Sequence, residues 1–168
     1  EDLDQPTGGL AFRDSDLYKW LEAACWTLVG ETDQELNDKV EIIIDLIKRA
    51  QGDDGYLNTY FVRERADKRW SNLRDLHELY CAGHLFQAAI AHYRATQKTD
   101  LLDVAVQFAD LIVETFGPGD DQIQGVPGHP EIEMALIELS RTTGDRRYLD
   151  QAAYFIQARG RGLIRSEE

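Results

Sequence analysis

Apolar residues recur every three or four positions along most of the chain, which is the spacing of amphipathic α-helices. A first helix is expected from residue 16 to about residue 28, with Asp14 or Ser15 suited to cap it. A second is expected over residues 33–50. The positions predicted to face inward are Leu17, Trp20, Leu21, Ala24 and Leu28 in the first helix and Leu36, Val40, Ile43, Ile44 and Ile47 in the second.

Four more helices are predicted further along, over residues 72–95, 100–115, 131–141 and 148–158. In the third, the inward positions are Leu76, Leu79, Tyr80, Gly83, Phe86, Ala89 and Ile90, and in the fourth they are Leu102, Ala105, Phe108, Ala109 and Ile112. Two segments predict loops: the turn-rich insertion 51–71, and residues 117–130, of which seven of 14 are Gly or Pro. Almost no segment has the alternation of a strand, so the predicted fold class is all-α.

An internal repeat relates the later helices. The pattern Leu-Asp-x-Ala-x-x-Phe begins at Leu102 and again at Leu149, a shift of 47 residues, and Arg94 and Thr96 recur as Arg141 and Thr143. The chain is therefore interpreted as three helical hairpins that bury a core by stacking, as an open solenoid or a closed ring. If the hairpins stack in parallel, the loops at 53–70 and 117–133 open on the same rim, where function is expected.

Composition excludes several classes of function. The 168 residues carry a formal net charge of −13, whereas a nucleic-acid-binding protein needs a basic surface for phosphates, so no nucleic-acid partner is expected. No apolar run approaches the roughly 20 residues of a membrane span, so no membrane partner is expected either. Cys25 and Cys81 do not indicate a disulfide framework. A cytoplasmic location is the expectation, although the chain does not begin with Met and its start is interpreted as incomplete.

The densest polar cluster is the segment 77–84. On a helix, His77, Cys81 and His84 would stand at i, i+4 and i+7 on one face, a possible metal-ligand spacing. The alternative is that Cys81 and His84 face the core and only His77 reaches the rim, where a neutral imidazole could bond a hydroxylated ligand. No third ligand is specified nearby, so a metal site is not the preferred interpretation.

Two further segments carry candidate residues. In 127–133, His129 lies between turn residues at the rim, while Pro130 suits the first helical position and Glu131 and Glu133 complement the helix dipole. In 53–61, turn residues, an amide and aromatic rings occur together, which suits either sugar binding or a loop packed by its own aromatics. The residues expected as possible lining of a sugar pocket are Asp54, Tyr56, Asn58 and Trp70.

Four motifs in this order, at residues 54–61, 69–73, 77–84 and 127–133, resemble glycoside hydrolase family 127, whose best-known activity is beta-L-arabinofuranosidase. The similarity runs from about residue 12 to residue 160. It implies an (alpha/alpha)6 barrel of six hairpins closed into a ring, of which residues 1–168 would form the N-terminal half. The resemblance also implies retaining hydrolysis of a terminal L-arabinofuranoside. His77 and His129 match the family's sugar-contacting histidines.

The resemblance further implies that the catalytic groups lie outside this segment. In that family the cysteine nucleophile, the glutamate acid/base and the mostly cysteine ligands of a zinc ion lie in later hairpins. No metal ligand or catalytic residue is therefore expected here, and the segment alone is expected to be inactive. The implied partners are an arabinofuranoside or a small sugar and the missing half of the barrel. The alternative is a free-standing helical-hairpin module that binds protein or carbohydrate without catalysis.

Overall fold

The computed structural model describes residues 9–163 and confirms the all-α class. Its single β pairing in that range is an isolated bridge between Phe116 and Ile123. A short 3-10 helix, η1 (Arg63–Lys68), which the hydrophobic pattern did not predict, lies between the second and third α-helices. The six α-helices are α1 (Asp14–Gly30), α2 (Gln34–Ala50), α3 (Glu78–Thr96), α4 (Asp100–Thr115), α5 (Ile132–Thr143) and α6 (Arg146–Ala158).

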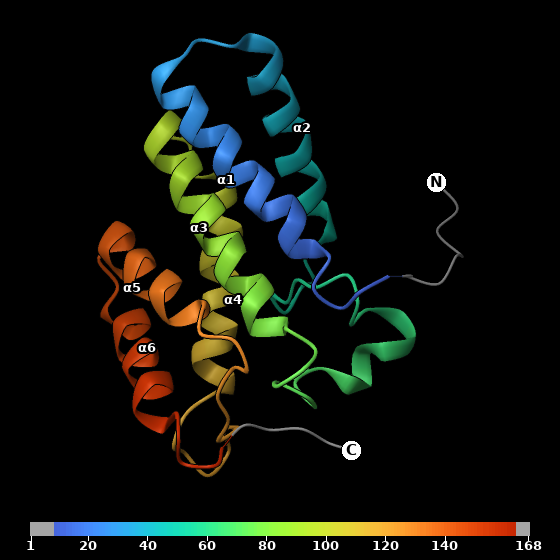
Figure 1. Ribbon diagram of the computed structural model, residues 1–168, viewed down its shortest axis with the longest axis vertical. Coiled ribbons are helices and arrows are strands. Elements are labelled where there is room, and N and C mark those ends of the chain that lie inside the picture. The colour runs from blue at the N-terminus through green and yellow to red at the C-terminus, as the bar shows by residue number, and fades with distance from the viewer. Residues whose placement is uncertain (1–8, 164–168) are drawn as a thin grey trace.

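Consecutive helices pair into three hairpins that stack side by side (Figure 1). Helices α1, α3 and α5 form one layer, in which α3 packs against both neighbours, and α4 packs between α2 and α6 in the other layer. The 47-residue repeat corresponds to the second and third hairpins. Phe108 and Phe155 are both fully buried, and the hydroxyls of Thr96 and Thr143 each donate to a carbonyl four residues earlier.

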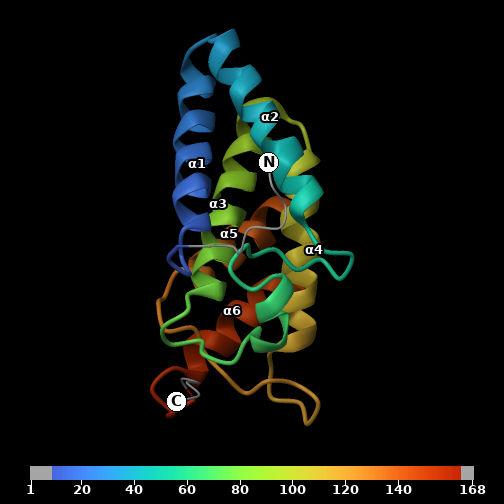
Figure 2. The same ribbon diagram turned by 90° about the vertical axis from the view of Figure 1, so that its right-hand side faces the viewer.

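The hairpins run in the same direction, so the two long loops lie at one end of the molecule. Both the α2–α3 loop and the α4–α5 loop lie at the lower end in two perpendicular views (Figures 1 and 2). Helices α3 and α5 begin at this end. The prediction of one shared rim is therefore confirmed, and the structure around this rim is the place to examine the candidate residues.

Helix α1 buries Leu21 and Ala24 and packs Leu28 against the core as predicted, but the predictions for Leu17 and Trp20 are wrong. Tyr18 and Cys25 are buried, whereas Leu17 and Trp20 are each 41% exposed. The hydrophobic period identifies a helix but does not determine how it is rotated about its axis when α2 and α3 both contact it. The inward positions predicted for α2 and α4 are confirmed as buried or packed against the core.

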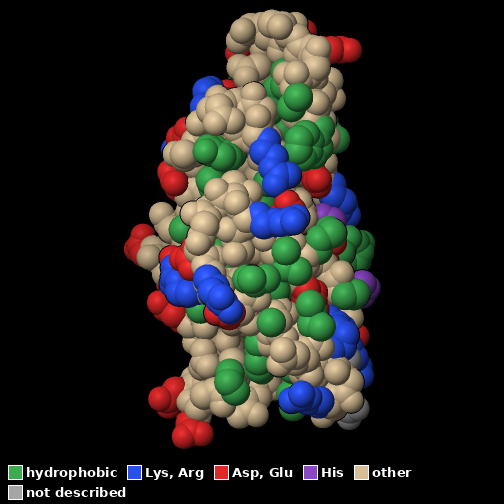
Figure 3. Space-filling model, turned by 90° about the vertical axis from the view of Figure 1, so that its left-hand side faces the viewer, with side chains coloured by type: hydrophobic (Ala, Val, Ile, Leu, Met, Phe, Trp, Pro, Cys, Tyr) green, Lys and Arg blue, Asp and Glu red, His purple; other side chains and the backbone are tan. Residues whose placement is uncertain are grey.

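Both flanks of the stack present apolar side chains to solvent. On the first flank, Leu17 of α1 and Leu46 of α2 line a groove with Ala50 and Leu57. On the last flank, Met134 of α5 and Ile156 of α6 are 54% and 55% exposed. Figure 3 faces the side of the molecule that carries α5 and α6 and shows hydrophobic side chains spread among basic ones along its length. Within residues 9–163, every helix is too short or too polar to span a lipid bilayer.

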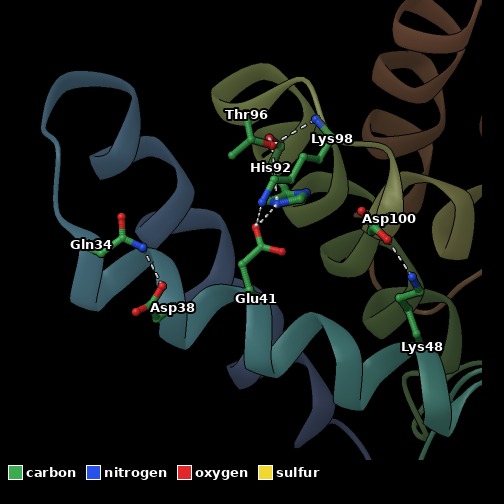
Figure 4. A network of polar contacts seen from close by, with 8 residues as sticks. All are labelled: Gln34, Asp38, Glu41, Lys48, His92, Thr96, Lys98 and Asp100. Carbon is green, nitrogen blue, oxygen red and sulfur yellow. Dashed lines mark hydrogen bonds and ion pairs between the residues drawn. The ribbon is translucent and has the colours of Figure 1, made fainter.

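A polar network joins the first two hairpins away from the rim (Figure 4). Glu41 of α2 accepts from Lys98 Nζ at 2.7 Å and lies 3.4 Å from Nε2 of the fully buried His92. Lys48 Nζ donates to Asp100 at 2.6 Å. Burial lowers the pKa of His92, so its imidazole is held neutral against the carboxylate. These contacts fix α2 against the α3–α4 turn.

Candidate functional site

Two histidines from different loops lie against each other at the rim. The ring centroids of His77 and His129 are 4.4 Å apart, with planes inclined by 36°. His77 ends the α2–α3 loop, and His129 lies near the end of the α4–α5 loop. The structure therefore brings together the two residues that the sequence singled out, 52 positions apart (129 − 77).

A tight turn before α3 places His77 at the rim. Asn72 Oδ1 accepts from the Asp75 N–H at 3.0 Å, and the Leu76 N–H donates to the Asn72 carbonyl. His77 itself has φ +60°, in the left-handed region, and α3 begins only at Glu78. The predicted start of this helix at residue 72 is therefore wrong, because the Asn72 side chain stabilises a turn in place of the first helical turns.

The second loop crosses this turn at close range. The Gly128 N–H donates to the Leu73 carbonyl at 2.9 Å, which joins the two histidine-bearing loops directly. Helix α5 then starts at Ile132, so Pro130 precedes the helix and does not occupy its first position as predicted. Glu133 lies in the first turn as expected, but its carboxylate is buried and paired with Arg159 at 2.5 Å.

The contacts of His77 determine which of its nitrogens faces a ligand. His77 Nδ1 lies 2.5 Å from the Asp75 carbonyl oxygen, which can only accept a hydrogen bond. Nδ1 therefore carries the proton, and in the neutral ring Nε2 is left as an acceptor. His129 is exposed beside it. The pair can thus bond hydroxyl groups of a ligand that reaches the rim.

Tyr80, on the first turn of α3, lies between three imidazoles. Its ring centroid is 5.6 Å from that of His77, 5.7 Å from that of His129 and 4.5 Å from that of His84. His84 Nδ1 lies 3.5 Å from Glu131 Oε1. Burial, with a contribution from the Lys19 charge, lowers the pKa of His84 to about 4. The contact with Glu131 is therefore one between a neutral imidazole and a carboxyl group, and not an ion pair at neutral pH.

Glu78, directly after His77, anchors the insertion from beneath. Its carboxylate is 1% exposed and accepts from the Tyr56 hydroxyl at 2.5 Å and from the Trp70 N–H at 2.8 Å. Trp70 has φ +63°, so this bond holds a residue in a conformation that non-glycine residues seldom adopt. Burial raises the pKa of Glu78 to about 7, while the two donated hydrogen bonds oppose that rise.

The predicted pocket-lining residues lie elsewhere than expected. Tyr56, Asn58 and Trp70 are buried beneath the rim, and Trp70 packs against Tyr56 and Phe116. Asp54 pairs with Arg69 at 2.7 Å, and its side chain faces a groove on the side of α4. The structure thus supports the alternative of a loop packed by its own aromatics. None of the four contacts the histidine pair directly in the contacts found within residues 9–163.

The described residues do not fit a metal ion. Within residues 9–163 no group of three or more His, Cys, Asp and Glu could hold one. Burial raises the pKa of Cys81 to about 12, so its sulfur is a protonated thiol packed near the Ala11 carbonyl and not a thiolate ligand. Cys25 is likewise buried, with its pKa raised to about 12. The zinc ion that the family resemblance implies therefore finds no set of three ligands within residues 9–163.

Sequence reasoning missed the residues that build the site from beneath. Glu78 and Tyr80 lie inside the 77–84 motif, where only an inward-facing position is predicted for Tyr80, and Gly128 lies in the predicted loop 117–130. The signal in the sequence is that Glu78 directly follows His77 and that Gly128 directly precedes His129. Gly128 joins the two histidine-bearing loops, and Glu78 joins the start of α3 to the insertion through the Trp70 N–H.

Comparison with known proteins identifies the family. The chain matches the beta-L-arabinofuranosidase GH127 catalytic domain over residues 4–167. It is 43% identical over 163 residues to the non-reducing end beta-L-arabinofuranosidase of Bifidobacterium longum subsp. longum, covering 95% of this chain and 25% of that protein. This chain thus spans about a quarter of that relative.

Solved structures of GH127 enzymes also match this chain. A GH127 beta-L-arabinofuranosidase from Geobacillus stearothermophilus T6 superposes with a TM-score of 0.91 at 50% identity, over 94% of this chain and 25% of that one. A second GH127 beta-arabinofuranosidase superposes with a TM-score of 0.88 at 37% identity, over 96% and 26%. The six helices match part of an (alpha/alpha)6 barrel. The chain belongs to the GH127 beta-L-arabinofuranosidase catalytic domain family.

Proposed function

We propose that this chain forms the N-terminal half of an (alpha/alpha)6 barrel in a retaining glycosidase that releases terminal L-arabinofuranose. The chain covers a quarter of the related enzymes, and the apolar flanks at Leu17 and Leu46 and at Met134 and Ile156 are where further hairpins would pack. Burying such surface stabilises a closed ring by roughly 25 cal/mol per Å². The ring-closing hairpins are thus partners of this segment.

In this proposal the segment binds the sugar and the later hairpins carry out the chemistry. The observation that carries it is the pair His77 and His129, whose rings lie 4.4 Å apart although they come from separate loops. Nε2 of His77 accepts from one sugar hydroxyl, and His129 bonds another. Neither cysteine here suits nucleophilic attack, since both thiols are buried and protonated. A cysteine of the later hairpins would be the nucleophile, and a zinc ion bound there would hold it in the thiolate form.

Substitution of the two histidines tests the assignment. In the full-length protein, His77→Ala and His129→Ala are each expected to weaken L-arabinose binding by about 10-fold or more, since each removes a hydrogen bond worth roughly 1–2 kcal/mol. Isothermal titration measures the affinity, and release of arabinose from a terminal beta-L-arabinofuranoside measures activity. Lys68→Ala, which changes an exposed side chain of the same insertion, is the control.

The outcomes test the roles of the two histidines and distinguish a hydrolase from a non-catalytic module. Binding that survives both histidine substitutions contradicts the assigned roles. Binding of carbohydrate by the full-length protein without any release of arabinose favours a non-catalytic module over a hydrolase.

A further inference from the structure

Tyr80 is the one aromatic side chain that touches both sugar-binding candidates within residues 9–163 besides the histidines themselves. It meets His77 edge to face, with planes at 86°, and it meets His129 at 63°. His129 is exposed and lies in a loop. Without a neighbour on that side, its imidazole would be free to rotate away from His77.

A residue of α1 and a second residue of α3 hold Tyr80 in turn. His84, one helical turn further along α3, packs edge-on against the Tyr80 ring, with 4.5 Å between the centroids. His84 in turn contacts Glu131, in the segment that leads into α5. Lys19 of α1 places its Nζ 5.5 Å from the centre of the Tyr80 ring, a cation–π contact. The ring is therefore held directly by Lys19 of α1 and by His84 of α3, and Glu131 supports it only through His84.

We propose that Tyr80 is a positioning residue for sugar binding, whose ring sets the orientation of both His77 and His129. This inference rests on the proposed function. A furanose that bonds both imidazoles benefits when their planes are set before binding, because affinity is gained by reducing the ordering cost. Tyr80 acts through the histidines and requires no contact with the sugar.

Packing alone is the competing explanation, and it makes a different prediction. A ring that only fills space would affect stability when removed, but not the ratio of binding to turnover. A positioning ring affects the imidazoles themselves, so their NMR signals and their affinity for the sugar change together.

The test compares two Tyr80 variants in the full-length protein. Tyr80→Phe keeps the ring and is expected to bind L-arabinose within about twofold of the wild type. Tyr80→Leu removes the ring and is expected to raise KM about 10-fold, equivalent to roughly 1.4 kcal/mol, with kcat changed less than about threefold. The Cε1–H signals of His77 and His129, observed by selective 13C labelling, are expected to broaden in Tyr80→Leu because the two imidazoles are no longer held in one orientation.

Tyr60→Leu is the matched control. Tyr60 is a half-buried residue of the insertion, and its ring contacts within residues 9–163 are with Phe61 and the Arg65 guanidinium and not with the histidines. The Tyr60→Leu substitution should leave the NMR signals of both histidines and the KM unchanged. Equal losses in the two leucine variants, or unchanged binding and signals in Tyr80→Leu, overturn the inference.

A measurement on the wild-type protein covers the case in which Tyr80→Leu does not fold. Nuclear Overhauser contacts are expected from the Tyr80 ring protons to Cε1–H of both histidines, and their absence overturns the inference. If the wild-type protein shows these contacts but neither binds nor cleaves an arabinofuranoside, the proposed function fails while the packing of Tyr80 on both histidines stands.

Discussion

Replacing Gly128 by alanine should push apart the two loops that carry the histidines. A β-carbon at this position would lie 2.2 Å from the Arg74 carbonyl oxygen and 2.7 Å from the Arg74 α-carbon. These are backbone atoms, so no side-chain rotation relieves the overlap. The Gly128 N–H bond to the Leu73 carbonyl would break as the loops separate. We expect a loss of about 3 kcal/mol of stability.

The same substitution is expected to abolish measurable L-arabinose binding, because His129 is the next residue along the chain. Gly30→Ala is the matched control. Gly30 ends α1, and its added β-carbon would meet nothing within 4 Å. Thermal unfolding and titration with L-arabinose are measured on both variants of the full-length protein. A Gly128→Ala protein that melts and binds like Gly30→Ala would show that the two loops do not approach so closely.

The second large effect is expected at Glu78. Glu78→Ala leaves the Tyr56 hydroxyl and the Trp70 N–H without an acceptor in a buried site, at about 1–3 kcal/mol for each group. The positive φ of Trp70 also loses the bond that holds it. We therefore expect a loss of about 3 kcal/mol or more, together with loosening of His77.

Glu78→Gln is the matched control, because an amide can satisfy both partners. Its oxygen accepts from the Trp70 N–H, and its NH₂ group donates to the Tyr56 hydroxyl, which is able to accept. Chemical denaturation of the full-length protein should place this variant near the wild type and Glu78→Ala well below it. Equal stability of the alanine and glutamine variants would contradict the anchoring role.

Titration of the Glu78 carboxyl group is also expected to make the stability of the fold depend on pH. Burial raises its pKa to about 7, above the value of about 4.3 for an unfolded chain. The folded state therefore holds the proton more tightly. The stability that this group contributes is fully present below about pH 4.3 and is lost as the pH rises through 7. Between pH 5 and pH 8 the wild type should lose more stability than Glu78→Gln, and identical pH profiles would contradict this titration.

The helices were the most predictable part of this protein. The bounds of α2 and α4 agree with the hydrophobic pattern to within one residue, because apolar periodicity and end residues such as Asp33, which caps α2 through its carboxylate, are local properties of the chain. The start of α3 was not predictable in this way. There the side chain of Asn72 competes with the helix for backbone N–H groups, and the loop that includes Gly128 favours the turn.

The sequence by itself determined the helical class and the three hairpins and singled out the two histidines as candidates, because helical period, repeat spacing and long motifs are properties of the linear sequence. Only the tertiary structure decided how α1 is rotated about its axis, that Tyr56 and Trp70 support the rim from within, and that the Tyr80 ring contacts both histidines. These features depend on how separate elements approach each other. Such distances follow from the packing of the whole stack, and no local pattern encodes them.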